Sequence, residues 1–139
     1  MTTIEQARGW TEEQQDSVAA GFVGRPWVPV TSDCWRLVVD FYQAFGVWLP
    51  FAAWRPSGPV DLRTLAPRVA AVRLVDGPPL FGDILVFGPP PDSDEQHLAV
   101  YINRGRALHS GRKTGAALQK VFPALQPRLQ AIYRIAAGV

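Results

Sequence analysis

Three side chains in this 139-residue sequence have the types and spacing needed for nucleophilic chemistry: Cys34, His97 and His109. Cys34 is the only cysteine, and the chain has only 2 histidines. An imidazole can take the proton of a thiol, and a third polar group can hold that imidazole in the right orientation. We therefore interpret Cys34 as a candidate nucleophile, His97 as its base and His109 as the orienting residue.

The stretch around Cys34 predicts a helix that begins at the cysteine. Ser32 and Asp33 are both favourable N-cap residues, because a short side-chain oxygen can accept a hydrogen bond from a free backbone N–H of the first turn. Apolar residues then recur at helical spacing until Gly46, which predicts where the helix stops. Cys34 would lie at the positive end of the helix dipole. This position favours a thiolate over a thiol, as a nucleophilic cysteine requires.

His97 opens a segment that predicts a β-strand. Residues 97–103 alternate between two faces, and His97, Ala99 and Tyr101 share one of them. Because Ala99 is small, we expect the Cys34 helix to pack close against that face.

The second histidine follows a predicted turn, and the length of this turn decides where the histidine points. With a turn of three residues, 104–106, Tyr101 would face His109 and both histidines would share one face of the sheet. With a turn of two residues, His109 would point to the opposite face and could not orient His97. We predict the three-residue turn, with Gly105 or a neighbour in a left-handed conformation.

The rest of the pattern predicts an α+β domain. Helix formers at residues 12–20 follow Thr11 as a cap, with Gln14 completing a capping box. A further short helix is predicted at residues 60–66. Helices that precede strands favour an α+β fold, with the Cys34 helix packed on a mostly antiparallel sheet, and the length fits a single domain over residues 1–139. The predicted strands cover residues 69–75, 82–87, 97–103, 107–110, 115–122 and 129–135.

Composition excludes several classes of function. The net charge is +2, and no basic stripe is interleaved with aromatic residues, so nucleic-acid binding is not expected. No stretch is long enough to span a membrane. Residues 1–8 lack the apolar run of a secretory signal, which predicts synthesis in a cytosol. A single cysteine cannot form an internal disulfide.

Each candidate residue also has a plainer interpretation. A lone cysteine is often an inert buried side chain, and a strand histidine often forms structural hydrogen bonds. Cys34 and the two histidines could instead be ligands of a zinc ion, which the lack of a CxxC pair disfavours. Asp83 is interpreted as a turn or strand-end residue. The basic residues between positions 104 and 113 are interpreted as a solvated face.

Several segments together resemble the NlpC-type cell-wall cysteine peptidases, a family with a compact papain-like fold. The resemblance runs from about Gly24 to His109, with a looser tail to Arg134. No single segment is specific, but their order and spacing match the family. The matching segments are Gly24-Arg25-Pro26-Trp27, Asp33-Cys34 with Leu37-Val38, Gly46 through Pro50, Phe81 through Phe87, His97 through Ile102, and Leu108-His109-Ser110.

The resemblance implies hydrolysis of an amide bond in peptidoglycan stem peptides, with no metal or other cofactor. Cys34 would be the nucleophile, His97 the general base and acid, and His109 the third polar residue. Asp33 would contribute to substrate recognition, for example through a free amine of the peptide.

Two tryptophans depart from the family pattern close to the cysteine. Secreted bacterial members have Cys-Ser-Gly where this chain has Cys34-Trp35-Arg36, and Trp27 replaces a tyrosine whose hydroxyl points into the active site. An indole donates one hydrogen bond but cannot accept one in its plane. Trp27 and Trp35 are therefore expected to belong to an altered substrate pocket.

The Asp33-Cys34-Trp35 form is most similar to a tail-associated branch of the family, found in tailed phages, prophages and gene transfer agents. That resemblance implies tail-tip or hub proteins as partners, synthesis in the host cytoplasm, and action on the wall of a target cell during DNA delivery. Two alternatives stay open. One is a free cytosolic or injected amidase. The other is a structural tail-hub subunit with weak or no catalysis, whose apolar patch would be Trp48, Phe51 and Trp54.

Overall fold

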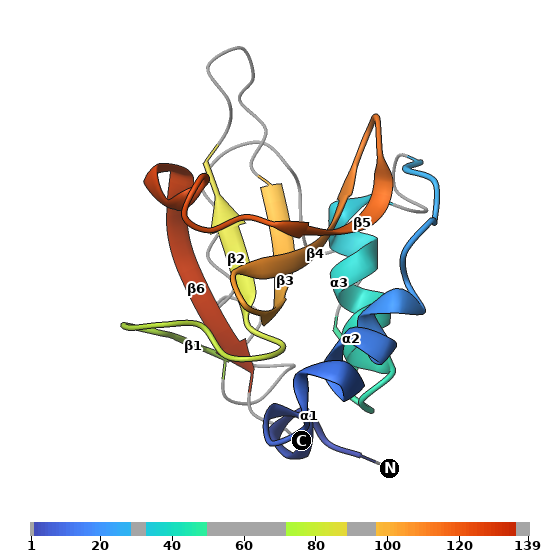
Figure 1. The fold of residues 1–139 in the computed structure, drawn as a ribbon, viewed down its shortest axis with the longest axis vertical. Coiled ribbons are helices and arrows are strands. Elements are labelled where there is room, and N and C mark those ends of the chain that lie inside the picture. Colours follow the sequence, from blue (N-terminus) through green and yellow to red (C-terminus); the bar gives the residue numbers. More distant parts are fainter. Residues whose placement is uncertain (1, 29–32, 50–71, 89–96, 136–139) are drawn as a thin grey trace.

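The computed structural model describes residues 2–28, 33–49, 72–88 and 97–135. Its centre is one sheet of six strands in the order β1-β6-β2-β3-β4-β5 (Figure 1). All neighbouring strands pair antiparallel, as the sequence predicts for most of the sheet. The strands are β1 (Val72–Leu74), β2 (Ile84–Phe87), β3 (His97–Asn103), β4 (Arg106–Gly111), β5 (Gly115–Lys120) and β6 (Leu129–Ile135).

Three α-helices precede the described strands: α1 (Ile4–Arg8), α2 (Glu12–Ala20) and α3 (Cys34–Gln43). The capping box of α2, in which Thr11 and Gln14 exchange hydrogen bonds, confirms the prediction from sequence. Helix α1 was not predicted, because five residues are too few for a periodic signal, yet it carries a capping box of its own. A short 3₁₀ helix, η3 (Gln126–Arg128), leads into β6. None of the described helices is long and apolar enough to cross a bilayer.

The predicted strands at residues 97–103 and 129–135 are confirmed residue for residue as β3 and β6. Strand β2 begins at Ile84, two residues later than predicted, and β5 ends at Lys120. The helix predicted at residues 60–66 lies outside the described residues, as do Ser32, Phe51 and Trp54.

Helix α3 packs on one face of the sheet, where its apolar side contacts every second residue of β3. Leu98, Val100 and Ile102 belong to the same core cluster as α3. Ala99 belongs to a second cluster on the other face. The expectation that α3 packs against the Ala99 face is therefore wrong. The larger apolar residues of β3 attract the helix, because they offer more surface to bury.

A buried ion-pair cluster ties the N-terminal helices to the sheet. Asp83 is fully buried and accepts two hydrogen bonds from the Arg134 guanidinium, at 2.9 Å and 2.7 Å. Arg8 of α1 lies 3.8 Å from the same carboxylate. Nearby, the Tyr42 hydroxyl of α3 donates to the Gly82 carbonyl. Asp83 is at the strand end, as predicted. Its burial was not predicted, nor was its place at the centre of the cluster with Arg134 and Arg8, which we call the Asp83 cluster.

Helix α2 holds the turn between β3 and β4. Asp16 of α2 pairs with Arg104 and Arg106, and the Asn103 amide donates to it as well. Arg104 and Arg106 therefore anchor the turn. The predicted solvated face is confirmed for Arg104, Arg112 and Lys113, which are exposed, whereas Arg106 is half-buried.

Candidate active site

The turn between the two histidine strands has two residues, Arg104 and Gly105. Asn103 and Arg106 are the paired residues that close it. Both turn residues have positive φ, 51° for Arg104 and 75° for Gly105. The predicted left-handed conformation is confirmed, and the predicted length of three residues is wrong.

The two histidines nevertheless share a face, because a β-bulge corrects the register. Asn103 pairs with Arg106, but Tyr101 pairs with Ala107, so Ile102 is an extra residue on β3. A turn of two residues alone would put His109 on the opposite face from His97, and the extra residue on β3 brings it back to the same face. Tyr101 therefore faces Ala107, and not His109 as predicted. The imidazoles of His97 and His109 come together, with 3.0 Å between Nε2 of the first and Nδ1 of the second.

Cys34 is the first residue of α3, as predicted. Asp33 is the N-cap, and its carboxylate accepts a hydrogen bond of 2.8 Å from the backbone N–H of Arg36. The sulfur lies close to the backbone N–H groups of Cys34 and Trp35, and the N–H of Leu98 hydrogen-bonds to it. That last N–H belongs to the peptide unit that joins His97 to Leu98. The structure thus places the thiol beside the backbone of His97.

The ionisation of Cys34 differs from the expectation. Burial of the side chain, which is 7% exposed, raises the pKa of the thiol to about 12, and the nearby Asp33 charge adds to this. The N–H groups at the helix start lower this pKa, as expected, but less than burial raises it. Cys34 is therefore a neutral thiol at neutral pH, and the predicted preference for a thiolate is wrong.

His97 is the first residue of β3, and it is held in its neutral form. Its burial is the main cause, and electrostatic interactions with His109 and Arg128 add to it, which together lower the pKa of His97 to about 4. A neutral imidazole keeps one nitrogen lone pair, so it is able to accept a proton at physiological pH. His97 and Cys34 are thus both uncharged at neutral pH, and the backbone N–H of Leu98 links the thiol to the strand that His97 opens.

His109, on β4, contacts both His97 and a residue that the sequence did not predict. Its Nε2 lies in hydrogen-bond contact with the amide oxygen of Gln119 on β5. The sequence pattern predicts a strand that contains Gln119, but it does not show that this strand pairs with β4 or in which register. The contact between Gln119 and His109 could therefore not be predicted. The three side chains form a continuous chain across β3, β4 and β5.

The predicted substrate-binding residues have different surroundings. Asp33 lies next to Cys34 as its helix cap. Trp27 is half-buried, with the Arg112 guanidinium 5.0 Å from its ring centre. Trp35 is 2% exposed and belongs to the core cluster that contains Cys34. Its burial leaves Trp35 to shape the site through packing, while Asp33 and Trp27 are at least partly accessible.

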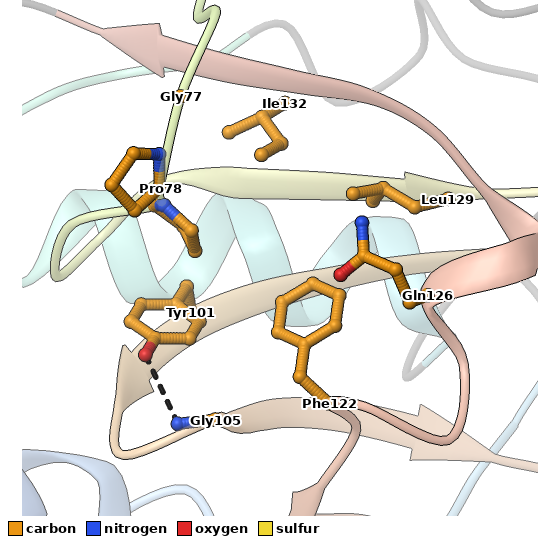
Figure 2. A pocket seen from close by; sticks show the side chains of 9 residues that line it. Gly77, Pro78, Tyr101, Gly105, Phe122, Gln126, Leu129 and Ile132 are labelled. Atoms are coloured by element: carbon orange, nitrogen blue, oxygen red, sulfur yellow. Dashed lines mark hydrogen bonds between the residues drawn. The ribbon is translucent and has the colours of Figure 1, made fainter.

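A separate pocket of about 380 Å³ opens on the face of the sheet away from α3 (Figure 2). Its lining includes Tyr101, Phe122, Leu129 and Ile132, all of the second core cluster. The Tyr101 hydroxyl accepts a hydrogen bond of 3.0 Å from the Gly105 N–H. None of the six predicted site residues lines this pocket. The described residues also contain no group of three or more His, Cys, Asp or Glu that could hold a metal ion.

A family model described as NlpC/P60 family matches residues 20–129, most of the chain. The chain belongs to the NlpC/P60 family. This agrees with the resemblance in the Cys34 and His97 segments. No curated protein matches the chain in a sequence comparison.

Solved structures share the NlpC/P60 fold at low sequence identity. An NlpC/P60 family protein from Bacillus cereus has a TM-score of 0.62 and 18% identity, covering 91% of this chain and 40% of its own length. The NlpC/p60 domain of the peptidoglycan hydrolase SagA has a TM-score of 0.57 and 16% identity, covering 91% of this chain and 100% of its own. In the effector–immunity complex Tae3–Tai3 of Ralstonia pickettii, the matching chain has a TM-score of 0.57 and 18% identity, with 91% and 100% covered. This chain thus spans less than half of the Bacillus cereus protein but all of the SagA domain.

Proposed function

We propose that this NlpC/P60 chain is a cysteine hydrolase that cleaves amide bonds in peptidoglycan stem peptides, and that residues 1–139 form a single peptidase domain. Cys34 is the nucleophile, His97 the general base and acid, and His109 the residue that orients His97. The observation that carries this proposal is the contact of 3.0 Å between the two imidazoles, at the residue whose peptide unit hydrogen-bonds to the only thiol.

The reaction starts from a neutral thiol and a neutral imidazole. As the Cys34 sulfur attacks the carbonyl carbon of the scissile amide, its proton moves to His97. His97 then gives this proton to the departing amine, which leaves an acyl thioester on Cys34. A water molecule, deprotonated by His97, hydrolyses the thioester and restores the thiol. The N–H groups at the start of α3 stabilise the negative charge that develops during attack.

The substrate class rests on the family and on its relatives. SagA, whose NlpC/p60 domain shares the fold, is described as a peptidoglycan hydrolase. Asp33 lies beside Cys34 and carries a carboxylate, which suits a free amine of a stem peptide. Trp27, half-buried next to Arg112, supplies an apolar surface for the substrate. The proposed reaction needs no metal or other cofactor.

The biological setting we propose is the tail tip of a phage-like particle. The Asp33-Cys34-Trp35 pattern supports this setting, in which the protein is made in the host cytoplasm, joins tail-tip or hub proteins, and opens the target cell wall during DNA delivery. Trp48, 71% exposed, offers an apolar contact for such partners. Copurification with a particle is the expected result, and a protein found only in free form would favour an injected amidase instead.

The test of the hydrolase function is digestion of purified peptidoglycan, with the released fragments identified by mass spectrometry. We expect Cys34→Ala to lower the rate of fragment release by about 10³-fold or more, because the nucleophile is lost. Ser17→Ala, at an exposed position of α2, is the matched control and should release fragments at the unchanged rate. Equal release by Cys34→Ala and the unaltered chain would overturn the mechanism. If neither chain releases fragments while both bind a tail-hub protein, the structural alternative holds.

A further inference from the structure

Gln119 extends the histidine pair to a third strand. In the pairing of β4 with β5, His109 faces Ala117 and Ala107 faces Gln119. His109 and Gln119 are therefore diagonal neighbours on the same face, close enough for side chains of this length to meet. The Gln119 amide oxygen contacts His109 Nε2, and His109 Nδ1 contacts His97 Nε2 at 3.0 Å. These contacts are two hydrogen bonds in series. The chemistry of the Gln119 amide oxygen decides which nitrogen donates in each.

An amide oxygen only accepts hydrogen bonds, so the proton in the first contact must belong to His109 Nε2. In its neutral form the His109 imidazole has one N–H, so a proton on Nε2 leaves Nδ1 with the lone pair. That lone pair accepts the proton on His97 Nε2, and the lone pair of His97 is then on Nδ1. Since Nε2 of His97 is already engaged by His109, Nδ1 is the nitrogen available to take a proton from Cys34.

We propose that Gln119 is a positioning residue, which fixes the tautomers of His97 and His109 so that the base nitrogen of His97 is free for the thiol. This inference rests on the proposed hydrolase function. If the Gln119 side chain turned its NH₂ group toward His109, every hydrogen bond in the chain would reverse. His97 Nδ1 would then carry a proton, and neither of its nitrogens could accept the proton of Cys34.

Three substitutions at Gln119 separate the direction of the hydrogen bond from its mere presence. Gln119→Glu can only accept at neutral pH, so it preserves the direction and should keep kcat within about twofold. Gln119→Met has a similar length but forms no such bond, so kcat should fall about fivefold, the typical worth of one exposed hydrogen bond. Gln119→Lys can only donate and favours the reversed chain, so kcat should fall further, by about tenfold or more. KM should stay unchanged in all three, because the proposed role of Gln119 acts through His109 and His97 and not through substrate binding.

Gln43→Met is the matched control, since Gln43 is exposed at the far end of α3. It should have the kcat of the unaltered chain. Equal kcat in Gln119→Glu, Gln119→Met and Gln119→Lys would overturn the inference. A loss in Gln119→Glu as large as that in Gln119→Lys would overturn it too, because the direction of the bond would then not matter.

Nitrogen-15 NMR of the imidazoles at neutral pH gives a readout that does not depend on hydrolysis. We expect His97 to carry its proton on Nε2 in the unaltered chain and in Gln119→Glu, and mainly on Nδ1 in Gln119→Lys. A proton on Nδ1 of His97 in the unaltered chain would overturn the inference alone. Hydrolysis that survives Cys34→Ala would overturn the proposed function instead, and the tautomers would still be read directly.

Discussion

The Asp83 cluster and the chain His97–His109–Gln119 are both polar groupings that the sheet brings together from distant parts of the sequence. In the Asp83 cluster, a fully buried carboxylate is held by the Arg134 guanidinium, with Arg8 close by. There, each charged group has an opposite charge beside it. At His97 and at Cys34, burial suppresses charge, because it lowers the pKa of His97 to about 4 and raises that of Cys34 to about 12.

The difference lies in the partners that each buried group has. A buried charge is tolerated when an opposite charge and hydrogen bonds replace its water. Asp83 has two cations close by, whereas the charge that acts on Cys34 is the carboxylate of Asp33, which opposes a thiolate. One grouping therefore contributes to holding the fold together. The other keeps its thiol and imidazole uncharged, which is the state from which the proposed reaction starts.

Removing the charge of Asp83 tests the first half of this comparison and should have the largest effect on stability. Asp83→Asn leaves Arg134 and Arg8 without their anion, so we expect a loss of roughly 3–5 kcal/mol in the free energy of unfolding. Urea denaturation at neutral pH measures it. Asp76→Asn, at an exposed position, is the control and should change stability by less than about 0.5 kcal/mol. A loss below about 1 kcal/mol for Asp83→Asn would mean that the pair contributes little beyond packing.

The ionisation of Cys34 tests the second half. A thiolate absorbs near the far ultraviolet edge and a thiol does not, so a pH titration of absorbance reports the charge. We expect no thiolate to appear below about pH 9, because a shift of this pKa from 9.0 to about 12 disfavours the anion by about 4 kcal/mol. Cys34→Ser supplies the baseline. A thiolate signal at pH 7 would show that the helix dipole outweighs burial after all.

The lowered pKa of His97 makes the stability of the fold depend on pH. Between pH 6.5 and about 4 the unfolded chain binds a proton at this residue and the folded chain does not, so stability falls as pH falls. The loss attributable to His97 should approach roughly 3 kcal/mol at pH 4. Urea denaturation of the unaltered chain and of His97→Gln, at several pH values, isolates it. Parallel pH profiles of the two proteins would contradict the buried, neutral His97.

Local patterns predicted most of the elements that carry the candidate site. The alternation of β3, the strand pattern of β6 and the caps of α2 and α3 depend on neighbours in sequence, and they were confirmed. The resemblance of the Cys34 and His97 segments to one family added the order in which the segments come, and the family match bears this out.

What the sequence could not predict depends on contacts between distant segments. The bulge at Ile102 is visible only when β3 and β4 are paired. The partner of His109 on β5 needs the register of a further pair of strands. The charge of Cys34 is a balance between burial and the helix dipole, and only the packed structure gives the first of these. The sequence predicts Asp83 only as a strand-end residue, because its ion pair with Arg134 depends on the pairing of distant strands.

The bulge at Ile102 also limits how this hairpin can change in length. Residues 102–106 join the paired residues Tyr101 and Ala107. Because side chains alternate between faces, inserting or deleting one residue in this stretch would carry His109 to the opposite face, while a change of two would keep it in place. Longer turns grafted onto this hairpin should therefore preserve the meeting of the two histidines only in steps of two residues.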